Sequence, residues 1–380
     1  MNKIKVIMIT NIISPYRIPL FNAIFKDANF DFKVVALAER EKNREWQILK
    51  EKIKFDYQVL IGWHWFIWGE KREVAIHLNR GVFKMLFENN PDIVITSGYD
   101  SLAYWQAFLY CKIFKKKFVV WNGSNLLTTY SKSGIRGKLK HIIIKAANGY
   151  IAYGIKAKEY LEYFGAIPEH IYISRNTVDM SYFRDKVFQY RNSINFKKER
   201  QRYPKYLLLY VGRLTKGKGV IQILKVLNNL ANSEVGFIII GSGPEKKKLE
   251  TCCTQNKIQN VVFEGFHQQD KLPMYYALAD IFIFPSFYDI WGLVVNEALA
   301  SGLYVLSSKY AGVSYDLIKD GWNGEIFNPY SINEIIELIK RTKENIKNIK
   351  MQREDISQNA CREFSIEKSA NEFIKAIKNV

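Results

Sequence analysis

Cysteine is scarce in this sequence of 380 residues. The four cysteines form no C-x-x-C pair and do not have the spacing of metal ligands: Cys111, Cys252, Cys253 and Cys361. We therefore expect neither a disulfide framework nor a metal site, and a reducing cytosolic environment fits best.

Long apolar runs are also missing. No run reaches the roughly 18 to 20 residues that a bilayer span requires, and the N-terminal residues lack the layout of a signal peptide. We expect a cytoplasmic protein. Its length corresponds to about two domains, and its hydrophobic content of 48% is sufficient for packed cores.

Acidic residues are few relative to basic ones. Lys and Arg number 56 against 37 Asp and Glu, which gives a formal net charge of +19. From Ser101 to Lys158 there are eleven Lys or Arg residues and no Asp or Glu. Nine of the eleven fall into two clusters: Lys112, Lys115, Lys116 and Lys117, then Lys132, Arg136, Lys138, Lys140 and Lys145.

This basic excess has three interpretations. Anionic lipid headgroups attract basic side chains by about 1 kcal/mol each near the surface, and Trp63, Trp65 and Trp68 are aromatic residues of the membrane-interface type. Peripheral binding at the inner face of the cell membrane is therefore one interpretation. A generally basic surface of solvated lysines is another. Binding to nucleic acid is the third. Nucleic acid is nevertheless not an expected partner, because no helix-turn-helix, zinc-finger or RNP-type pattern accompanies the charge.

Glycine is absent from the first predicted strand-to-helix loop. An apolar strand is predicted over Ile4–Ile9 and a helix over Ile18–Phe25, and the loop between them contains no glycine. A dinucleotide fold would place G-x-G-x-x-G there, so NAD binding is not expected. Tyr16 and Arg17 lie at the carboxyl end of the strand, where open α/β sheets bind ligands, and are candidate acceptor-binding residues.

Short apolar segments alternate with longer helical ones in the first half of the chain. Strands are predicted at 32–37, 93–96, 118–121 and 150–153. This alternation is typical of a doubly wound parallel sheet. The polar loops after two of these strands contribute Tyr99 and Asn122 as further candidates for acceptor binding.

A second β-loop-α unit begins with an apolar strand at Tyr206–Val211. The following loop, Gly212–Gly219, is close to the phosphate-binding pattern G-x-x-x-x-G-K-[ST], but Gly219 replaces the hydroxyl residue that holds magnesium. Arg213 and Lys218 supply positive charge, and the glycines allow a phosphate to approach the backbone.

The segment from Pro285 to Gly302 is the clearest ligand-site candidate. It follows an apolar strand at Ile281–Phe284, and a helix is predicted from Gly292, whose free N–H groups favour an anion. Asp289 in the loop and Glu297 in the helix would repel a phosphate but accept hydrogen bonds from hydroxyl groups. A ligand with both phosphate and hydroxyl groups is a nucleotide sugar.

These segments resemble the family-4 retaining glycosyltransferases, which have the GT-B fold. Asp289 and Glu297 are similar to the family's E-x7-E signature, with Asp in place of the first Glu. The resemblance implies that Glu297 binds the ribose of the donor nucleotide and that Asp289 contacts the transferred sugar. It also implies that Arg213 and Lys218 hold the donor pyrophosphate without a metal.

The resemblance adds donor contacts from glycine turns, a base-binding edge and the helix N-terminus: Gly212, Gly243, Phe266, Gly292, Leu293 and Val294. Many relatives have a histidine where this chain has Asn122, so any catalytic use of that position would be by hydrogen bonding.

The fold that the resemblance implies is α/β: two Rossmann-like doubly wound domains facing a central cleft. We expect an acceptor-binding domain at 1–187, a linker at 188–204 where the sequence is highly charged without periodicity, and a donor-binding domain at 205–365. A C-terminal helix at 366–380 is expected to pack back on the first domain.

The implied function is a retaining, metal-independent glycosyltransferase without a cofactor. Its donor would be a UDP- or GDP-sugar, and its acceptor a saccharide or lipid-linked saccharide in the assembly of a bacterial surface polysaccharide or lipopolysaccharide. Two alternatives stay open. A sugar-nucleotide epimerase of the same fold would bind the donor without an acceptor, and a non-enzymatic nucleotide- or nucleic-acid-binding protein would explain the charge but give Asp289 and Glu297 no role.

Overall fold

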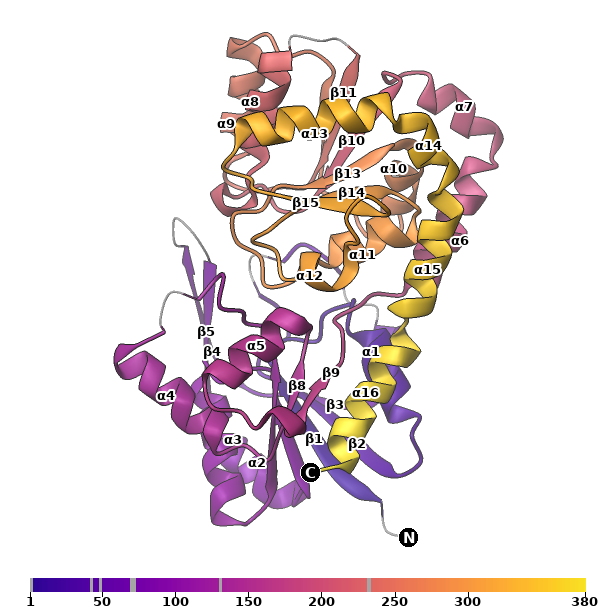
Figure 1. Cartoon of the computed structure of the whole chain (residues 1–380). Helices are drawn as coiled ribbons and strands as arrows, with labels where there is room; N and C mark the ends of the chain where they lie inside the picture. The colour runs from indigo at the N-terminus through magenta and orange to yellow at the C-terminus, as the bar shows by residue number, and fades with distance from the viewer. Residues whose placement is uncertain (1–2, 42–43, 48–49, 69–72, 130–131, 231–233) are drawn as a thin grey trace. The chain divides into compact units, whose positions relative to one another are not determined.

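The computed structural model describes residues 3–41, 44–47, 50–68, 73–129, 132–230 and 234–380 (Figure 1). The chain forms two compact units. Unit 1 comprises Met1–Asn176 together with Ile366–Val380, and unit 2 comprises Thr177–Ser365. The sequence therefore returns to unit 1 at its C-terminal end.

Unit 1 is built on a parallel sheet of seven strands in the order β3-β2-β1-β6-β7-β8-β9. Its strands are β1 Ile4–Thr10, β2 Phe30–Ala36, β3 Asp56–Val59, β6 Ile93–Thr96, β7 Lys117–Asn122, β8 Gly149–Ala152 and β9 Ile171–Ile173. A separate antiparallel hairpin consists of β4 Gly62–Trp68 and β5 Glu73–Asn79. The parallel strands are apolar on both faces because helices cover both.

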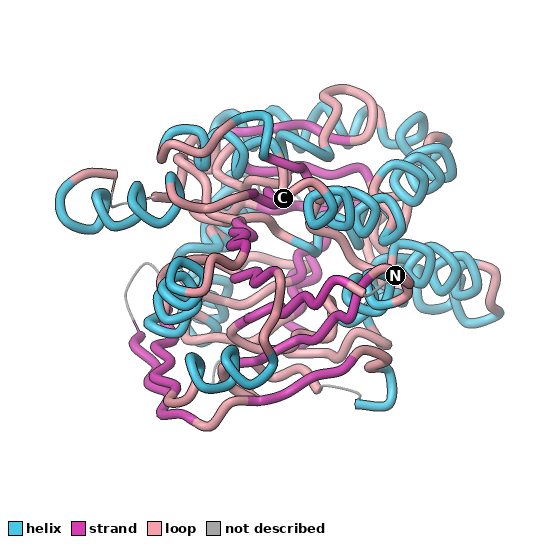
Figure 2. Tube along the Cα trace, turned by 90° about the horizontal axis from the view of Figure 1, so that it is seen from below, coloured by secondary structure: helices cyan, strands magenta, loops and turns pink. Residues whose placement is uncertain are grey.

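The two faces of this sheet bury different helices. Alternate residues of β1 divide between two cores: Ile7 and Ile9 pack with α2, α3, α4 and α5, whereas Val6 and Met8 pack with α1 and α16. The helices lie outside the strands (Figure 2). Their bounds are α1 Ile18–Phe25, α2 Val82–Asn89, α3 Leu102–Ile113, α4 Gly134–Lys145, α5 Ile155–Tyr163 and α16 Ile366–Lys378, with single turns at Lys50–Lys52 and Pro168–His170.

The C-terminal helix α16 completes unit 1. The Phe373 ring lies 5.3 Å from the Trp121 ring of β7, and Ser174 Oγ donates to the Ser369 carbonyl at 2.9 Å. In Figure 1 the yellow α16 runs beside the indigo α1. The last residues of the chain are thus a structural part of the first sheet's core.

Unit 2 contains a six-stranded parallel sheet in the order β12-β11-β10-β13-β14-β15. The strands are β10 Tyr206–Val211, β11 Val235–Ile240, β12 Val261–Gly265, β13 Ile281–Phe284, β14 Tyr304–Ser308 and β15 Gly324–Phe327. The helices are α6 Met180–Arg191, α7 Ile194–Arg200, α8 Val220–Leu230, α9 Lys246–Gln255, α10 Leu272–Leu278, α11 Leu293–Ala300, α12 Ser314–Leu317, α13 Ile332–Glu344, α14 Ile346–Met351 and α15 Arg353–Glu363, with one turn at Lys216–Lys218.

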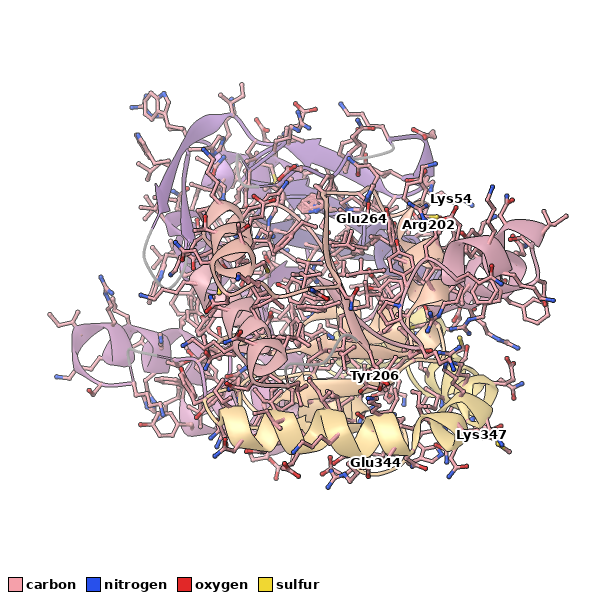
Figure 3. All side chains as sticks on the ribbon, turned by 90° about the horizontal axis from the view of Figure 1, so that it is seen from above. Lys54, Arg202, Tyr206, Glu264, Glu344 and Lys347 are labelled. Atoms are coloured by element: carbon pink, nitrogen blue, oxygen red, sulfur yellow. The ribbon has the colours of Figure 1, made fainter. Side chains whose placement is uncertain are left out.

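A buried tyrosine joins this sheet to α13. Tyr206, at the start of β10, forms a 2.6 Å hydrogen bond with the Thr342 hydroxyl of α13, whereas Glu344, at the end of the same helix, is exposed (both labelled in Figure 3). Unit 2 therefore fixes this helix to its sheet by a polar contact inside the core.

The segment 188–204, expected to be a linker, is mostly helical and lies within unit 2. The boundary between the units falls at Asn176 and Thr177 instead. The physical reason is long-range: Arg200 of α7 pairs with Asp280 Oδ2 at 2.7 Å, and Asp280 is only 1% exposed. A charged segment that resembles a solvated linker is held in place by a buried partner eighty residues away.

Candidate functional site

The strand order of unit 2 reverses between β10 and β13. These neighbours are followed in the sheet by β11 and β12 on one side and by β14 and β15 on the other. In an open α/β sheet, a ligand-binding crevice forms at the carboxyl ends of the strands at such a point. The loops that follow β10 and β13 are 212–219 and 285–292. Both lie in segments that the sequence indicated as parts of a ligand site.

These two loops are joined through their backbones. The Phe287 N–H donates to the Gly217 carbonyl at 2.8 Å, and Ser286 Oγ donates to the same oxygen at 3.2 Å. Gly219 has a φ of +67°, and a Cβ at this position would collide with the Pro285 carbonyl. Only glycine permits both the left-handed backbone and the close approach.

Lys218 and Asp289 meet where these loops join. The Lys218 ammonium forms an ion pair with the Asp289 carboxylate, and the two side chains are only 19% and 15% exposed. The other carboxylate oxygen of Asp289 accepts a hydrogen bond from the Trp291 N–H at 3.2 Å. Asp289 is therefore more than a turn residue, because it positions the cation expected to bind phosphate.

Arg213 lies at the end of β10, between Gly212 and Leu214. The Gly212 N–H donates to the Ile240 carbonyl at 2.9 Å, and the Leu214 N–H donates to the Ser242 carbonyl at 2.7 Å. A Cβ on Gly243 would collide with the Leu214 backbone. The Arg213 loop and the glycine turn after β11 thus pack backbone against backbone, and Arg213 itself is half-buried.

The N-terminus of α11 opens into the same loop. Gly292 precedes the helix with a φ of +111°, and the half-buried Leu293 and Val294 are its first two residues. The first N–H groups of an α-helix have no partner within the helix and carry partial positive charge. Phe266, at 38% exposure, follows directly after β12. The predicted positions for phosphate and base binding thus all follow strand ends of one sheet.

Glu297 is fully buried inside α11. Its Oε2 accepts a 2.7 Å hydrogen bond from the Tyr276 hydroxyl of α10, and within the described part of the chain its Oε1 has no hydrogen-bond partner. Burial raises the pKa of Glu297 from 4.5 to about 8, and the hydrogen bond from Tyr276 acts in the opposite direction. A buried acceptor oxygen without a donor is unfavourable and suits a hydroxyl ligand.

Tyr276 was not predicted as a site residue. It lies in an apolar helical segment, and no motif in the sequence connects it to Glu297, twenty-one residues further on. The contact arises only when α10 and α11 pack in the folded unit. A buried tyrosine hydroxyl requires a polar partner, but the sequence does not reveal which one.

Arg17 and Tyr16 follow β1 in unit 1, where the strand order again reverses between β1 and β6. The Arg17 guanidinium lies 3.8 Å from the centre of the Trp121 ring and donates a hydrogen bond to the Tyr153 hydroxyl. Tyr16 is half-buried. Three strand ends therefore converge on Arg17, whose guanidinium is engaged within unit 1, and a role of Tyr16 or Arg17 in acceptor binding stays a prediction.

The other two acceptor candidates are occupied within unit 1. Tyr99 is buried, and its hydroxyl is hydrogen-bonded to that of Tyr160 on α5. Asn122 is buried at the end of β7; its amide donates to the Ser124 carbonyl at 3.1 Å and accepts from the Ser124 N–H at 3.2 Å. Both side chains stabilise their own loops, and a role in acceptor binding stays a prediction.

Metal ligands do not cluster in the described residues: no group of three or more His, Cys, Asp or Glu side chains is arranged to hold an ion. The lack of such a group among the described residues does not test whether the site works without a metal. Metal independence therefore stays a prediction.

Residues 192–363 match the model of the family described as glycosyl transferases group 1. The matched segment lies within unit 2 and includes its whole sheet. Residues 192–363 are thus similar to group 1 glycosyltransferases, which confirms the resemblance that the E-x7-E pattern predicted.

Two relatives show how far the likeness extends. The sulfoquinovosyl transferase SQD2 of Arabidopsis thaliana is 34% identical over 139 residues, which are 36% of this chain and 26% of that protein. An uncharacterized 41.2 kDa protein in the cps region of Klebsiella pneumoniae is 26% identical over 301 residues, or 78% of each chain. The alignment thus spans a small part of the first relative and most of the second.

The fold extends the likeness to both units. The crystal structure of Anabaena Alr3699/HepE in complex with UDP matches with a TM-score of 0.76 over 99% of this chain and 100% of that one, at 16% identity. Two parallel-sheet α/β units with this match confirm the predicted GT-B class.

Proposed function

We propose that this protein is a retaining, metal-independent glycosyltransferase that moves a sugar from a UDP- or GDP-sugar to a saccharide or lipid-linked saccharide. The observation that carries the proposal is the direct contact of Lys218 with Asp289 at the reversal point of the unit 2 sheet. This contact supports the proposal, because a cation suits a phosphate, a carboxylate suits sugar hydroxyls, and a nucleotide sugar carries both groups.

The diphosphate leaving group would be stabilised by positive charge. Arg213, Lys218 and the free N–H groups at Leu293 and Val294 all follow β10 or β13, which are neighbours in the sheet. When the bond between the anomeric carbon and the phosphate oxygen breaks, these groups neutralise the developing charge. Lys218 would leave Asp289 for the phosphate, and the freed carboxylate would accept hydrogen bonds from the sugar.

The acceptor hydroxyl would attack the anomeric carbon from the side on which the diphosphate departs, and a phosphate oxygen would take its proton. The new bond then has the configuration of the old one, and no protein base is needed. Glu297 would accept hydrogen bonds from the donor ribose through Oε1. Because this carboxylate is fully buried, the residues that cover it have to move when the donor binds.

The acceptor is proposed from the charge of unit 1, and the proposed setting is the assembly of a bacterial surface polysaccharide or lipopolysaccharide at the inner face of the cell membrane. The segment from Ser101 to Lys158, with eleven basic and no acidic residues, lies wholly in unit 1 and would attract an anionic membrane surface. A relative named for the cps region of Klebsiella pneumoniae covers most of the chain. Within the described ranges, no helix is both long and apolar enough to cross a bilayer.

Cleavage of the donor in the presence of EDTA tests this function. Wild-type protein should release nucleoside diphosphate from one UDP- or GDP-sugar, and proton NMR should first detect a sugar with the donor's anomeric configuration. Asp289→Ala should lose this activity, whereas Asp270→Ala, which changes an exposed carboxylate of unit 2, should keep it. A product of inverted configuration would contradict the retaining mechanism, and an epimerised sugar nucleotide would favour the epimerase alternative.

A further inference from the structure

Helix α4 of unit 1 exposes an apolar stripe. Ile135, Leu139 and Ile142 are 79%, 43% and 52% exposed. Their spacing of i, i+4 and i+7 places them on one side of the helix. Scattered apolar residues are normal on a surface, whereas three aligned on one helix face form an apolar stripe that calls for an explanation.

The opposite side of α4 already packs against the core of unit 1. Ile143 and Ile144 are completely buried, and Gly137 is buried beside them. Lys140 also turns inward, with its ammonium 5.3 Å from the centre of the Phe164 ring. The helix therefore has its core contacts without the stripe, which is a second apolar face.

Exposed basic residues flank the stripe. Lys138 and Lys145 lie beside it along one edge, and Arg136 is exposed as well. No Asp or Glu occurs between Ser101 and Lys158, so no carboxylate of the segment offsets this charge. A helix that combines an apolar face with basic flanks is the type that lies in a membrane interface.

Helix α3, whose end lies beside the end of α4, also exposes apolar side chains. The Lys112 ammonium of α3 donates to the Ala146 carbonyl at the end of α4 at 2.7 Å, so the C-terminal ends of the two helices are adjacent. They cover the same face of the unit 1 sheet (Figure 1). Leu109 and Ile113 of α3 are exposed, and Lys112 lies between them in sequence. Two helices with adjacent ends thus both expose apolar and basic side chains.

We propose that this surface, Ile135, Leu139, Ile142, Lys138 and Lys145 of α4 with Leu109, Lys112 and Ile113 of α3, docks onto an anionic lipid bilayer. The apolar side chains enter the interface while the lysines contact the phosphate headgroups. The inference rests on the proposed membrane-associated function and specifies which surface performs it. The hairpin tryptophans Trp63 and Trp65 are exposed too, whereas the side chain of Trp68 lies outside the described residues.

Two other occupants fit the surface less well. A second copy of the chain, bound through the same surface, would bring the lysines of both copies close together, and like charges repel. A nucleic acid would satisfy the lysines but leave Ile135, Leu139 and Ile142 in water, because its backbone offers them no apolar partner. An anionic bilayer satisfies both the charge and the apolar stripe.

Flotation with phosphatidylcholine vesicles, with and without an equal part of phosphatidylglycerol, tests the proposal. Wild type should bind the anionic vesicles, and less so as salt is added. Ile135→Gln with Leu139→Gln and Ile142→Gln should lower the affinity at least about tenfold, because three apolar side chains no longer leave water. Lys138→Gln with Lys145→Gln should lower it roughly fivefold per lysine at low salt, which corresponds to about 1 kcal/mol each.

A matched control replaces three exposed apolar residues of unit 2: Phe188→Gln, Ile194→Gln and Met351→Gln. It should bind the vesicles as wild type does. The proposal is overturned if wild type ignores anionic vesicles, or if the α4 triple variant binds like this control. It is also overturned if only the lysine variant loses vesicle binding and the same variant loses RNA binding, which would indicate a nucleic-acid surface. Loss of self-association by the triple variant in the absence of vesicles, with vesicle binding unchanged, would indicate a surface for a second copy and would overturn it too.

Donor binding on the same preparations separates this inference from the proposed function. A protein that responds to a nucleotide sugar but ignores vesicles overturns the docking surface alone. A protein that binds vesicles through α4 but responds to no nucleotide overturns the glycosyltransferase site and leaves the surface standing.

Discussion

Glu297 combines complete burial, one hydrogen bond from Tyr276 and a pKa raised by burial to about 8. Between about pH 4.5 and 8, the folded protein therefore holds a proton at this group that the unfolded chain has lost. Stability must fall as pH rises through this interval, because the state that binds more protons is disfavoured at higher pH. In this interval the buried carboxyl is protonated, and above about pH 8 its ionised form is maintained at a cost in folding free energy.

Glu297→Gln removes this titration. We expect the variant to gain stability relative to wild type as pH is raised from 5 to 9, by about 2 kcal/mol or more, since a tenfold change in proton affinity corresponds to roughly 1.4 kcal/mol. Thermal unfolding of both proteins at the two pH values measures the difference. The exposed Glu344 (Figure 3) supplies the control, Glu344→Gln, whose difference from wild type should not change with pH. If the stability difference between Glu297→Gln and wild type were the same at both pH values, Glu297 would not have the raised pKa described.

Tyr276 is inferred to position Glu297 without touching the donor. Tyr276→Phe should weaken nucleotide binding about three- to tenfold, because the carboxylate loses the hydrogen bond that orients it, a loss of about 1 kcal/mol. Tyr206→Phe is the matched control, since it removes another buried tyrosine hydrogen bond of unit 2, to Thr342. Both variants should lose similar thermal stability, but calorimetry with UDP and GDP should show weaker binding only for Tyr276→Phe. Equal affinities would exclude the positioning role.

At the scale of elements, Asp280 joins the helices around the unit 2 sheet. Its carboxylate accepts from Arg200 Nη2 at 2.7 Å, Lys350 Nζ at 2.8 Å and Arg353 Nη2 at 3.0 Å, and also from the Leu207 N–H at 3.0 Å. One buried anion thereby connects α7, α14 and α15 to β10. The desolvation of this carboxylate is offset only while all of these partners remain.

Asp280→Asn should therefore destabilise the protein by about 3–5 kcal/mol, because it leaves three neighbouring cations without their counter-charge. Urea unfolding measures the effect, and Asp270→Asn, at an exposed position, is the control. A loss of no more than about 1 kcal/mol, the size usual for a surface pair, would show that the cluster is not needed to hold the helices.

At the scale of the whole molecule, most of the fold follows from local pattern. The apolar segments at Ile4–Ile9, Tyr206–Val211 and Ile281–Phe284 predicted β1, β10 and β13 within one residue, because buried parallel strands are continuously apolar. The hairpin β4–β5 and the helices α6 and α7 were not predicted. Their residues are charged or aromatic without clean periodicity, and α7 is held by a long-range partner, Asp280.

The sequence could predict only those residues of the candidate site that lie in short contiguous motifs. Arg213, Lys218, Asp289 and Glu297 lie in short motifs beside predicted strand ends, so the sequence could single them out. The ion pair between Lys218 and Asp289 joins residues that are seventy-one positions apart, and no local pattern encodes it. The same holds for Tyr276 beneath Glu297. Motifs reveal residues in the loops, whereas their pairing depends on the sheet order.

The most direct test of the account is a calorimetric screen of UDP, GDP, ADP and their common sugars against wild type and Arg213→Ala, with EDTA present. Arg202→Ala, which changes an exposed arginine of unit 2, is the control. We expect one nucleotide to bind wild type and Arg202→Ala equally, and to bind Arg213→Ala at least about tenfold more weakly, because a charge-assisted contact to phosphate is lost. Binding of no nucleotide by wild type, or equal binding by Arg213→Ala, would contradict the donor site on which the proposed function depends.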